Sequence, residues 1–443
     1  MNMQTAVNVR TCIDERPLGR FQFVVAALCA LIVFLDGFDT QAIGYVAPAI
    51  IKELGVSRAS LSPVFSASLI GLMLGALIGG PTSDRFGRRP VLLGGFIFFG
   101  MMSLLTVMAN SIESLLAVRL LTGLGLGCVM PNAIALTSEY APARVRSTTV
   151  MVMTCGFSLG AALGGLAAAV LIKDFGWRSV FIAGGVAPLI CAIAVWRFLP
   201  ESVRFLVVNN GDKRRIENIM SKVAPELAGL GISFVVDEQK ETKSPVKQLF
   251  ADKRARLTAV LWVVFFMNLM DLYFLSNWLP TVINDAGIPV SSAALIASML
   301  QIGGTVGTLA LGRIFDKVPP FFALAVTYLL AAVFIVGVGF STASTPALIG
   351  TIFGAGFCVI GGQIGANSLA ARCYPTAIRA TGVGWALGIG RIGSVIGPAI
   401  GGMMLSMHFN MAHLFMIAAI PVFIAGLGAL TIGLSNQGRQ LAE

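Results

Sequence analysis

Residues 80–89, GPTSDRFGRR, form a short charged break between two long apolar stretches. A related segment, GRIFDK at residues 312–317, follows an apolar stretch in the second part of the chain. The aspartates of these segments, Asp84 and Asp316, are 232 residues apart. This duplication predicts a chain of two halves, each with the same order of apolar helices and charged connections.

The composition is typical of a chain embedded in lipid. Of its 443 residues, 56% are hydrophobic and 12% are charged, which is more apolar surface than a soluble domain of this length can bury. Stretches of about 20 apolar residues can cross the hydrocarbon core as helices. We predict an all-α polytopic membrane protein with twelve such helices, at residues 22–50, 60–82, 90–109, 112–138, 148–173, 178–199, 257–284, 291–314, 320–341, 346–372, 377–405 and 409–434.

Residues that are charged, small or helix-breaking recur at nearly the same offset. The pairs 232 or 233 residues apart include Asp39 and Asp271, Pro48 and Pro280, Pro142 and Pro375, Arg146 and Arg379, Gly160 and Gly393, and Gly164 and Gly397. Repeats of this kind place two helical bundles around an axis along the membrane normal, with a site between them near the midplane. We therefore expect two pseudo-symmetric six-helix bundles.

Lys and Arg gather at alternate connections between the predicted helices, which indicates a positive-inside topology with both termini in the cytoplasm. The net charge of +10 thus reflects topology and not a nucleic-acid-binding surface. No small-residue cleavage site follows the Arg-containing N-terminal segment, so we expect no removed signal peptide. The basic connections contain Arg85, Arg88, Arg89, Arg144, Arg146, Arg204, Arg256, Arg313, Lys317, Arg372 and Arg379.

The most polar long segment, residues 200–256, divides the chain. We expect a six-helix bundle at residues 1–199, a cytoplasmic linker at residues 200–256, and a second six-helix bundle at residues 257–443. Within the linker, residues 212–230 have the pattern of an amphipathic helix. Residues 233–247 are the candidate for disorder.

The charged break at residues 80–89 is predicted to form a latch on the cytoplasmic face. Asp84 can lie near the positive N-terminal end of a neighbouring helix, and the arginines can pair with Glu139 at the end of the fourth helix. Positive charge that only anchors the topology is the alternative interpretation. The residues assigned to this gate are Asp84, Arg85, Arg88, Glu139, Arg146, Asp316 and Arg379.

Ionisable residues inside the predicted helices require an explanation, because each costs about 2.5–3.5 kcal/mol at mid-bilayer on insertion scales. Asp36 and Asp39 lie three residues apart in the first helix and therefore on one face. Two buried carboxylates on one face repel each other, which favours binding of a proton by one of them. We assign both to proton coupling, together with Arg119 and Asp271. A permanent ion-paired triad of the first three residues is the alternative.

Two arginines inside the helices have no counterpart in the other half of the chain. At the repeat offset, Arg119 corresponds to Ile352 and Arg391 corresponds to Ser158. A planar guanidinium suits a carboxylate, because it donates two parallel charge-assisted hydrogen bonds. We expect Arg391 to bind the carboxylate of a ligand, with an ion pair to Asp271 as the alternative.

No pattern in the sequence points to catalysis or to a bound group. The seven Cys and two His have no zinc, haem or disulfide spacing, and the hydrolase, metalloprotease and ATP-binding motifs are absent. We expect no enzyme activity, no metal and no cofactor. A channel would need a continuous polar pore, whereas repeated midplane charges favour a gated site.

Further motifs carry a resemblance to a known family. Residues 35–48 read LDGFDTQAIGYVAP, residues 119–127 read RLLTGLGLG, Pro131-Asn132 follows, and residues 199–202 read LPES. The segment at residues 80–89 resembles the signature loop of the major facilitator superfamily, and the whole set resembles its aromatic acid:proton symporter family over nearly the whole chain. Members of that family import hydroxybenzoates, benzoate, vanillate and phenylpropanoids into bacteria.

The resemblance implies a twelve-helix carrier of the bacterial inner membrane that imports a small aromatic carboxylate with protons by alternating access. Asn268 replaces the first acid in the seventh helix, so the halves should not share coupling equally. We expect a monomer in the lipid bilayer. The alternative functions are proton symport of another small organic anion, such as nicotinate, and proton-coupled export of drug-like compounds. The residues expected to contact substrate are Arg391, Asp39, Asn277, Tyr328, Trp385 and Gln301.

Overall fold

The computed structural model describes residues 6–209, 211–227, 232–236, 246–251, 254–315, 318–374, 378–407 and 409–434. Among them are twelve helices that are long and apolar enough to cross a membrane, as the composition predicts. They are α2 (Arg20–Leu54), α3 (Ser62–Phe86), α4 (Arg88–Thr106), α5 (Ile112–Tyr140), α6 (Arg146–Phe175), α7 (Arg178–Phe198), α10 (Ala255–Asp285), α11 (Val290–Phe315), α12 (Pro320–Phe340), α13 (Thr345–Cys373), α14 (Arg379–Ser406) and α15 (Met411–Gly433).

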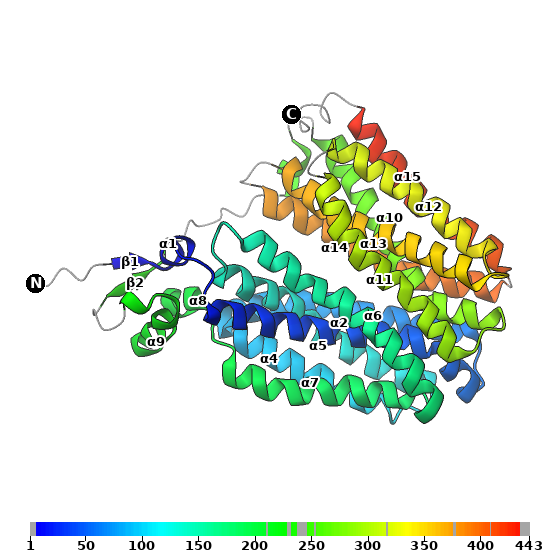
Figure 1. The fold of residues 1–443 in the computed structure, drawn as a ribbon, viewed down its shortest axis with the longest axis horizontal. Coiled ribbons are helices and arrows are strands. Elements are labelled where there is room, and N and C mark those ends of the chain that lie inside the picture. Colours follow the sequence, from blue (N-terminus) through cyan, green and yellow to red (C-terminus); the bar gives the residue numbers. More distant parts are fainter. Residues whose placement is uncertain are drawn as a thin grey trace, which may run out of the picture.

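The twelve helices form two bundles with the same internal packing. In the N-terminal bundle α3 packs on α5, α2 on α6 and α4 on α7. In the C-terminal bundle the equivalent pairs, α11 with α13, α10 with α14 and α12 with α15, pack in the same way. The predicted duplication is therefore present in the fold, as Figure 1 shows by the two diverging groups of helices.

Glycine allows the tightest of these pairings in both bundles. A Cβ at Gly123 of α5 would overlap the carbonyl oxygen of Ser68 in α3, and a Cβ at Gly356 of α13 would overlap that of Leu300 in α11. These four residues occupy equivalent positions of the repeat. Small residues of this kind let helix backbones approach closely in lipid, where no hydrophobic force drives the helices together.

The linker and the N-terminal arm form a small layer on one end of the N-terminal bundle (Figure 1). Strands β1 (Ala6–Asn8) and β2 (Ser233–Val235) pair in parallel, with Ala6 opposite Ser233. Apolar residues of the arm, the linker and the ends of the bundle helices form one cluster. We call this the linker end of the molecule. The other elements of this layer are α1 (Val9–Asp14), α8 (Val203–Val208), α9 (Lys213–Val223) and η2 (Pro225–Leu227). The last element of the linker, η3 (Val246–Phe250), packs on α10 of the C-terminal bundle.

The linker agrees with the sequence only in part. The predicted amphipathic helix at residues 212–230 is present as the shorter α9, and residues 228–230 lie outside the described part. Strand β2 falls within residues 233–247, for which disorder was the alternative interpretation, and residues 237–245 are again outside the description. No sequence pattern predicts the pairing of β1 with β2, because the paired residues Ala6 and Ser233 are far apart along the chain.

The two bundles contact each other at the end opposite the linker. Arg58 of η1 (Arg58–Leu61) forms an ion pair with Asp285 of α10 at 2.8 Å. Close by, the rings of Phe65 and Trp278 meet edge to face, with centres 5.0 Å apart, and Ser62 Oγ donates to the carbonyl oxygen of Pro398 at 3.1 Å. The bundles are therefore closed at this end, and they diverge toward the linker end (Figure 1).

Candidate functional site

Asp39 and Arg119 form a completely buried ion pair inside the N-terminal bundle. Arg119 Nη2 lies 3.0 Å from Asp39 Oδ2, and neither side chain has exposed surface. Ser103 of α4 donates to Asp39 Oδ1 at 2.7 Å, so both carboxylate oxygens are bonded. The guanidinium lies over the ring of Phe181, 5.4 Å from its centre. Loss of one partner would leave a desolvated charge alone, which is strongly destabilising.

Asp36 lies almost one helical turn before Asp39 on α2 and is also buried. Its Oδ1 accepts a hydrogen bond from Thr40 Oγ1 at 3.0 Å. The charges that act on Asp36 are Asp39 on its own helix and Arg391 of α14 in the other bundle. Asp39 is thus neutralised within its own bundle, whereas Asp36 lies within electrostatic reach of the C-terminal bundle.

Arg391 is half-buried in α14. Its Nη1 donates to the hydroxyl oxygen of Tyr273 in α10 at 3.3 Å. The ion pairs among the described residues do not include Arg391, and the alternative that it pairs with Asp271 is not realised in this conformation. Arg391 therefore has guanidinium hydrogens available for a ligand at the bundle interface.

A small cavity of about 10 Å³ lies between the bundles. Its walls come from α2, α3, α5 and α10, and five of the nine lining side chains are polar. Tyr273 belongs to this wall and also accepts from Arg391, so its side chain connects Arg391 to the cavity. The polar side chains of the wall are Thr40, Ser68, Arg119, Tyr273 and Asn277.

Asp271 lies apart from the other intramembrane charges. Its Oδ2 accepts the backbone N–H of Val422 in α15 at 3.0 Å, next to Pro421, which lies inside that helix. Asp271 also borders a groove of about 230 Å³ lined mainly by Met and Ile side chains, among them the exposed Ile420. The repeat partner of Asp39 thus bonds to backbone beside the outer surface of its bundle.

The remaining residues expected to bind substrate fall into two groups. Asn277 lines the small cavity, and Gln301 lies behind it, where its Nε2 donates to Ser276 Oγ at 3.4 Å. Tyr328 is fully buried in the core of the C-terminal bundle, and its hydroxyl has no partner among the described residues. Trp385 is 43% exposed and stacks on Trp262 with centres 5.8 Å apart, away from the cavity wall.

The predicted gate is partly assembled at the linker end. Arg88 Nε donates to Glu139 Oε1 at 2.8 Å, the pairing that the sequence suggested. The Asp84 side chain near the end of α3 is 72% exposed, and its Oδ1 lies 3.6 Å from Nη2 of Arg88, the first residue of α4. Arg85 lies over the adjacent Phe86 ring, and Asp316 is outside the described residues.

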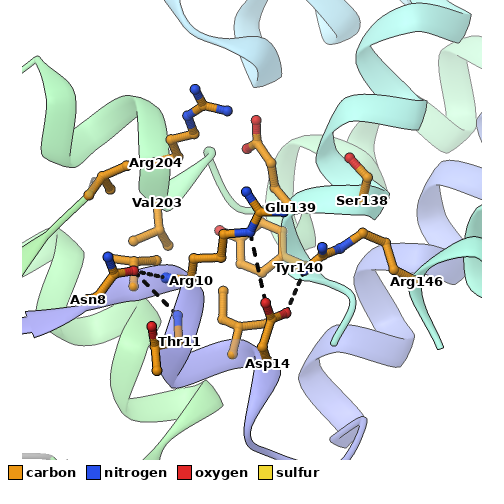
Figure 2. A pocket seen from close by; sticks show the side chains of 13 residues that line it. Asn8, Arg10, Thr11, Asp14, Ser138, Glu139, Tyr140, Arg146, Val203 and Arg204 are labelled. Carbon is orange, nitrogen blue, oxygen red and sulfur yellow. Dashed lines mark hydrogen bonds and ion pairs between the residues drawn. The ribbon is translucent and has the colours of Figure 1, made fainter. Parts of the chain in front are cut away.

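Arg146 and Arg379, the gate residues that match across the repeat, make the same local contact. Arg146 Nε donates to the carbonyl oxygen of Ala141 at 3.1 Å, and Arg379 Nε donates to that of Tyr374 at 3.4 Å. Only the first is also bound by the N-terminal arm, through Asp14 Oδ1 at 2.5 Å. A cavity of about 540 Å³ surrounds this contact, with Arg10 and Arg146 on either side of Asp14 (Figure 2).

Glu201 contacts the predicted gate, although the sequence analysis did not assign it to the gate. It lies in the LPES motif, and its Oε1 accepts the backbone N–H groups of Arg88 and Arg89 at 3.0 and 3.2 Å. A carboxylate at a helix N-terminus satisfies free N–H groups and the helix dipole together. Gly87 is required here, because its φ is +99° and a Cβ would meet the Glu201 carboxylate. The signature segment is therefore held rigidly to the end of α7.

Comparison with known proteins agrees with this architecture. The sequence profile of the Major Facilitator Superfamily matches residues 29–367. The chain is 43% identical to the 4-hydroxybenzoate transporter PcaK of Pseudomonas putida, over 97% of this chain and 96% of that protein. It is 40% identical to the gallate transporter of the same species, over 96% and 95%.

The fold also resembles solved transporter structures. The inward open conformation of the xylose transporter XylE from E. coli superimposes with a TM-score of 0.71, at 18% identity, over 92% of this chain and 95% of that one. At this identity the likeness shows the fold alone. Among the described residues no cluster of three or more His, Cys, Asp or Glu could hold a metal ion.

Proposed function

This chain belongs to the major facilitator superfamily, in the same family as the 4-hydroxybenzoate and gallate transporters, and we propose that it imports a small aromatic carboxylate with protons by alternating access. The observation that carries this proposal is Arg391. It lies in α14, its charge acts on the buried Asp36 of the other bundle, and among the described residues its bonded partner is a tyrosine and not an acid. A basic group at that place fits an anionic substrate.

The carboxylate of the substrate binds Arg391 through the guanidinium hydrogens that Tyr273 leaves free. Because an arginine fork matches a carboxylate in two parallel hydrogen bonds, it fixes orientation as well as charge. Tyr273 holds one edge of the guanidinium and thereby aims the other edge.

Protons are coupled through Asp36 and Asp39. Asp36 feels the positive charge of Arg391, so binding of an anion at that arginine removes part of the stabilisation of the ionised acid and favours its protonation. Asp39 is bound to Arg119 at 3.0 Å, and its protonation would release the arginine. Asp271 has no charged partner among the described residues, and it contributes less to coupling in this proposal.

The linker end faces the cytoplasm of a bacterial cell, since the basic connections gather there. The bundles close at the opposite end through Arg58, Asp285, Phe65 and Trp278, so the conformation is open to the cytoplasm. In the outward-open state Asp84 and the arginines of the signature segment close the linker end.

The protein functions as a monomer, residues 200–256 link its two bundles, and it needs no cofactor.

Uptake into liposomes that contain the purified protein tests this proposal. An inward proton gradient should drive accumulation of a labelled hydroxybenzoate or benzoate, and an uncoupler should abolish it. Unlabelled acid loaded inside should accelerate entry of labelled acid, because a carrier exchanges substrate and a channel does not. Benzamide, which lacks the anion, serves as the matched control. If a proton gradient drove entry of benzamide at the rate of benzoate, recognition of the substrate carboxylate by Arg391 would be ruled out.

A further inference from the structure

The cavity of about 540 Å³ at the linker end has the volume of a small-molecule site. Three separate parts of the chain form its walls. Arg10 of the N-terminal arm lies between Arg204 of α8 and Arg146 of α6 (Figure 2). Glu139 at the end of α5 and Val236, which directly follows β2, also line it. The cavity therefore depends on the folding of the arm and the linker onto the N-terminal bundle.

The charged groups of the wall leave one cation without a partner. Asp14 is paired with Arg146 at 2.5 Å. Glu139 Oε1 accepts from Nε of Arg88 at 2.8 Å, and Arg88 lies outside the wall. Arg204 is exposed, and it makes no ion pair or hydrogen bond with any described residue. The cavity thus offers the whole guanidinium fork of Arg204 to an anion.

Other parts of the wall are apolar. Val9, Ile13 and Val203 line the cavity and are buried. The hydroxyl of Tyr140 donates to the carbonyl oxygen of Glu201, so this residue offers the cavity its ring and no free donor. An apolar wall beside an unpaired guanidinium suits a ligand with a carboxylate at one end and an apolar body. An inorganic anion would leave the apolar wall in contact with water.

We propose that this cavity is a second binding site, on the cytoplasmic side, for a small carboxylate with an apolar body, and that acid released into the cytoplasm slows further import by binding there. This inference rests on the proposed function, which places the linker end in the cytoplasm. Arg204 binds the carboxylate, and the apolar wall contacts the body. We call this the cytoplasmic site, and the site at Arg391 the central site.

The cytoplasmic site shares two residues with the predicted gate, Glu139 and Arg146. We therefore expect closure of the linker end to change the shape of its wall. A ligand that binds the present shape more tightly than the closed one stabilises the inward-open state. Occupancy of the cytoplasmic site thus delays the return of the carrier to the outward-open state.

The number of labelled benzoate molecules bound per protein, measured by equilibrium dialysis of the purified full chain, tests this inference. The wild type should bind two, one at the central site and one at the cytoplasmic site. Arg204→Gln should weaken only the cytoplasmic site, by at least about tenfold, because it removes a charge-assisted hydrogen bond. Arg204→Lys should recover part of this loss. Arg144→Gln is the matched control, since it removes the same charge at the same end from an exposed position outside the wall.

Exchange in liposomes with the linker end inside tests the effect on import. Low concentrations of benzoate inside should accelerate entry of labelled benzoate, and higher concentrations should slow entry again as the cytoplasmic site fills. Arg204→Gln should keep the acceleration and lose the slowing. If this variant slows at the same internal concentration as the wild type, the cytoplasmic site does not control import.

The two sites can fail separately. A wild type that binds one benzoate, lost in Arg391→Ala and kept in Arg204→Gln, overturns the cytoplasmic site and leaves the proposed function intact. Equal weakening by Arg144→Gln and Arg204→Gln also overturns it, because general attraction of charge then accounts for the binding. If Arg391→Ala binds as many benzoate molecules as the wild type, the proposed function fails instead.

Discussion

The two bundles keep the same helices and the same packing, but they place equivalent acids in opposite surroundings. Asp39 is bound by Arg119 and Ser103 in the closed interior of the N-terminal bundle. Its repeat partner Asp271 is bound by a backbone N–H of α15 and borders an apolar groove near the surface of its bundle. The position of an acid survived the duplication, whereas its charged partner is present in one half only.

This difference suggests a division of labour between the bundles. The N-terminal bundle holds two buried acids, of which Asp39 is paired with Arg119 and Asp36 is bonded to Thr40. The C-terminal bundle has Asn268 in place of the first acid, and its amide bonds Gln363 at 2.6 Å. It presents Arg391 to the interface instead. We therefore expect substitutions of equivalent residues in the two halves to have unequal effects.

Asp39→Asn should have the largest effect, with loss of proton-driven accumulation of substrate. The amide cannot exchange a proton and leaves Arg119 without a counter-ion in a buried site, which costs about 3–5 kcal/mol when a buried pair is broken. Asp36→Asn should be similar or milder. Accumulation against a gradient is measured in liposomes, with folding checked by size-exclusion chromatography. Concentrative uptake by the Asp36→Asn/Asp39→Asn double variant would remove this pair from the coupling mechanism.

Arg391→Ala should weaken binding of the acid at least about tenfold, since a charge-assisted hydrogen bond contributes about 1.5–3 kcal/mol and 1.4 kcal/mol is a factor of ten. Arg391→Lys should recover only part, because it keeps the charge without the planar fork. Affinity is measured by titration calorimetry for benzoate and benzamide. If the arginine reads the carboxylate, benzamide binds the wild type weakly and loses little more in the alanine variant.

Asp84→Asn should slow transport while substrate affinity stays close to that of the wild type. The residue lies at the exposed linker end, far along α3 from the cavity, so its contribution comes when the bundles close there. The rate of exchange and the equilibrium affinity are measured on the same preparation. A wild-type rate, or a defect that is wholly one of affinity, would contradict the latch.

Asp271→Asn should have a small effect, and this substitution is the direct counterpart of Asp39→Asn. The amide oxygen can still accept the N–H of Val422, and no counter-ion among the described residues is left without a partner. We expect proton-driven accumulation to persist at a reduced level. Loss of accumulation as complete as in Asp39→Asn would show that both halves couple protons equally, as their matching positions suggest.

Much of this architecture follows from the sequence, because spans, duplication and signature motifs each leave a local pattern. The pairing of Arg88 with Glu139 could be expected for the same reason. Other features depend on packing that no pattern records. Tyr328 and Trp385 are suitable types for an aromatic ligand, yet one is enclosed by its own bundle and the other stacks on Trp262. Tyr273, which joins Arg391 to the cavity, has no charge or motif to distinguish it.

The smallest effect is expected where charges of the two halves pair with each other. Arg58 and Asp285 lie 2.8 Å apart, with 49% and 27% of their side chains exposed, and solvent screens such a pair so that it contributes about 0.2–1 kcal/mol. Arg58→Gln or Asp285→Asn should therefore shift the balance between inward-open and outward-open states by about 1.5–5-fold, and the remaining contacts of Phe65 and Trp278 should keep transport active.

The populations are measured from the distance between spin labels at the exposed Glu113 and Ala343 of the two bundles, in a background without native cysteines. The exchange variant Arg58→Asp/Asp285→Arg should restore the wild-type balance, because it keeps the attraction and reverses only its direction. If the single variants leave the populations unchanged while the exchange variant alters them, the pair does not stabilise the closed end, and the apolar contact of Phe65 with Trp278 holds the two halves together there.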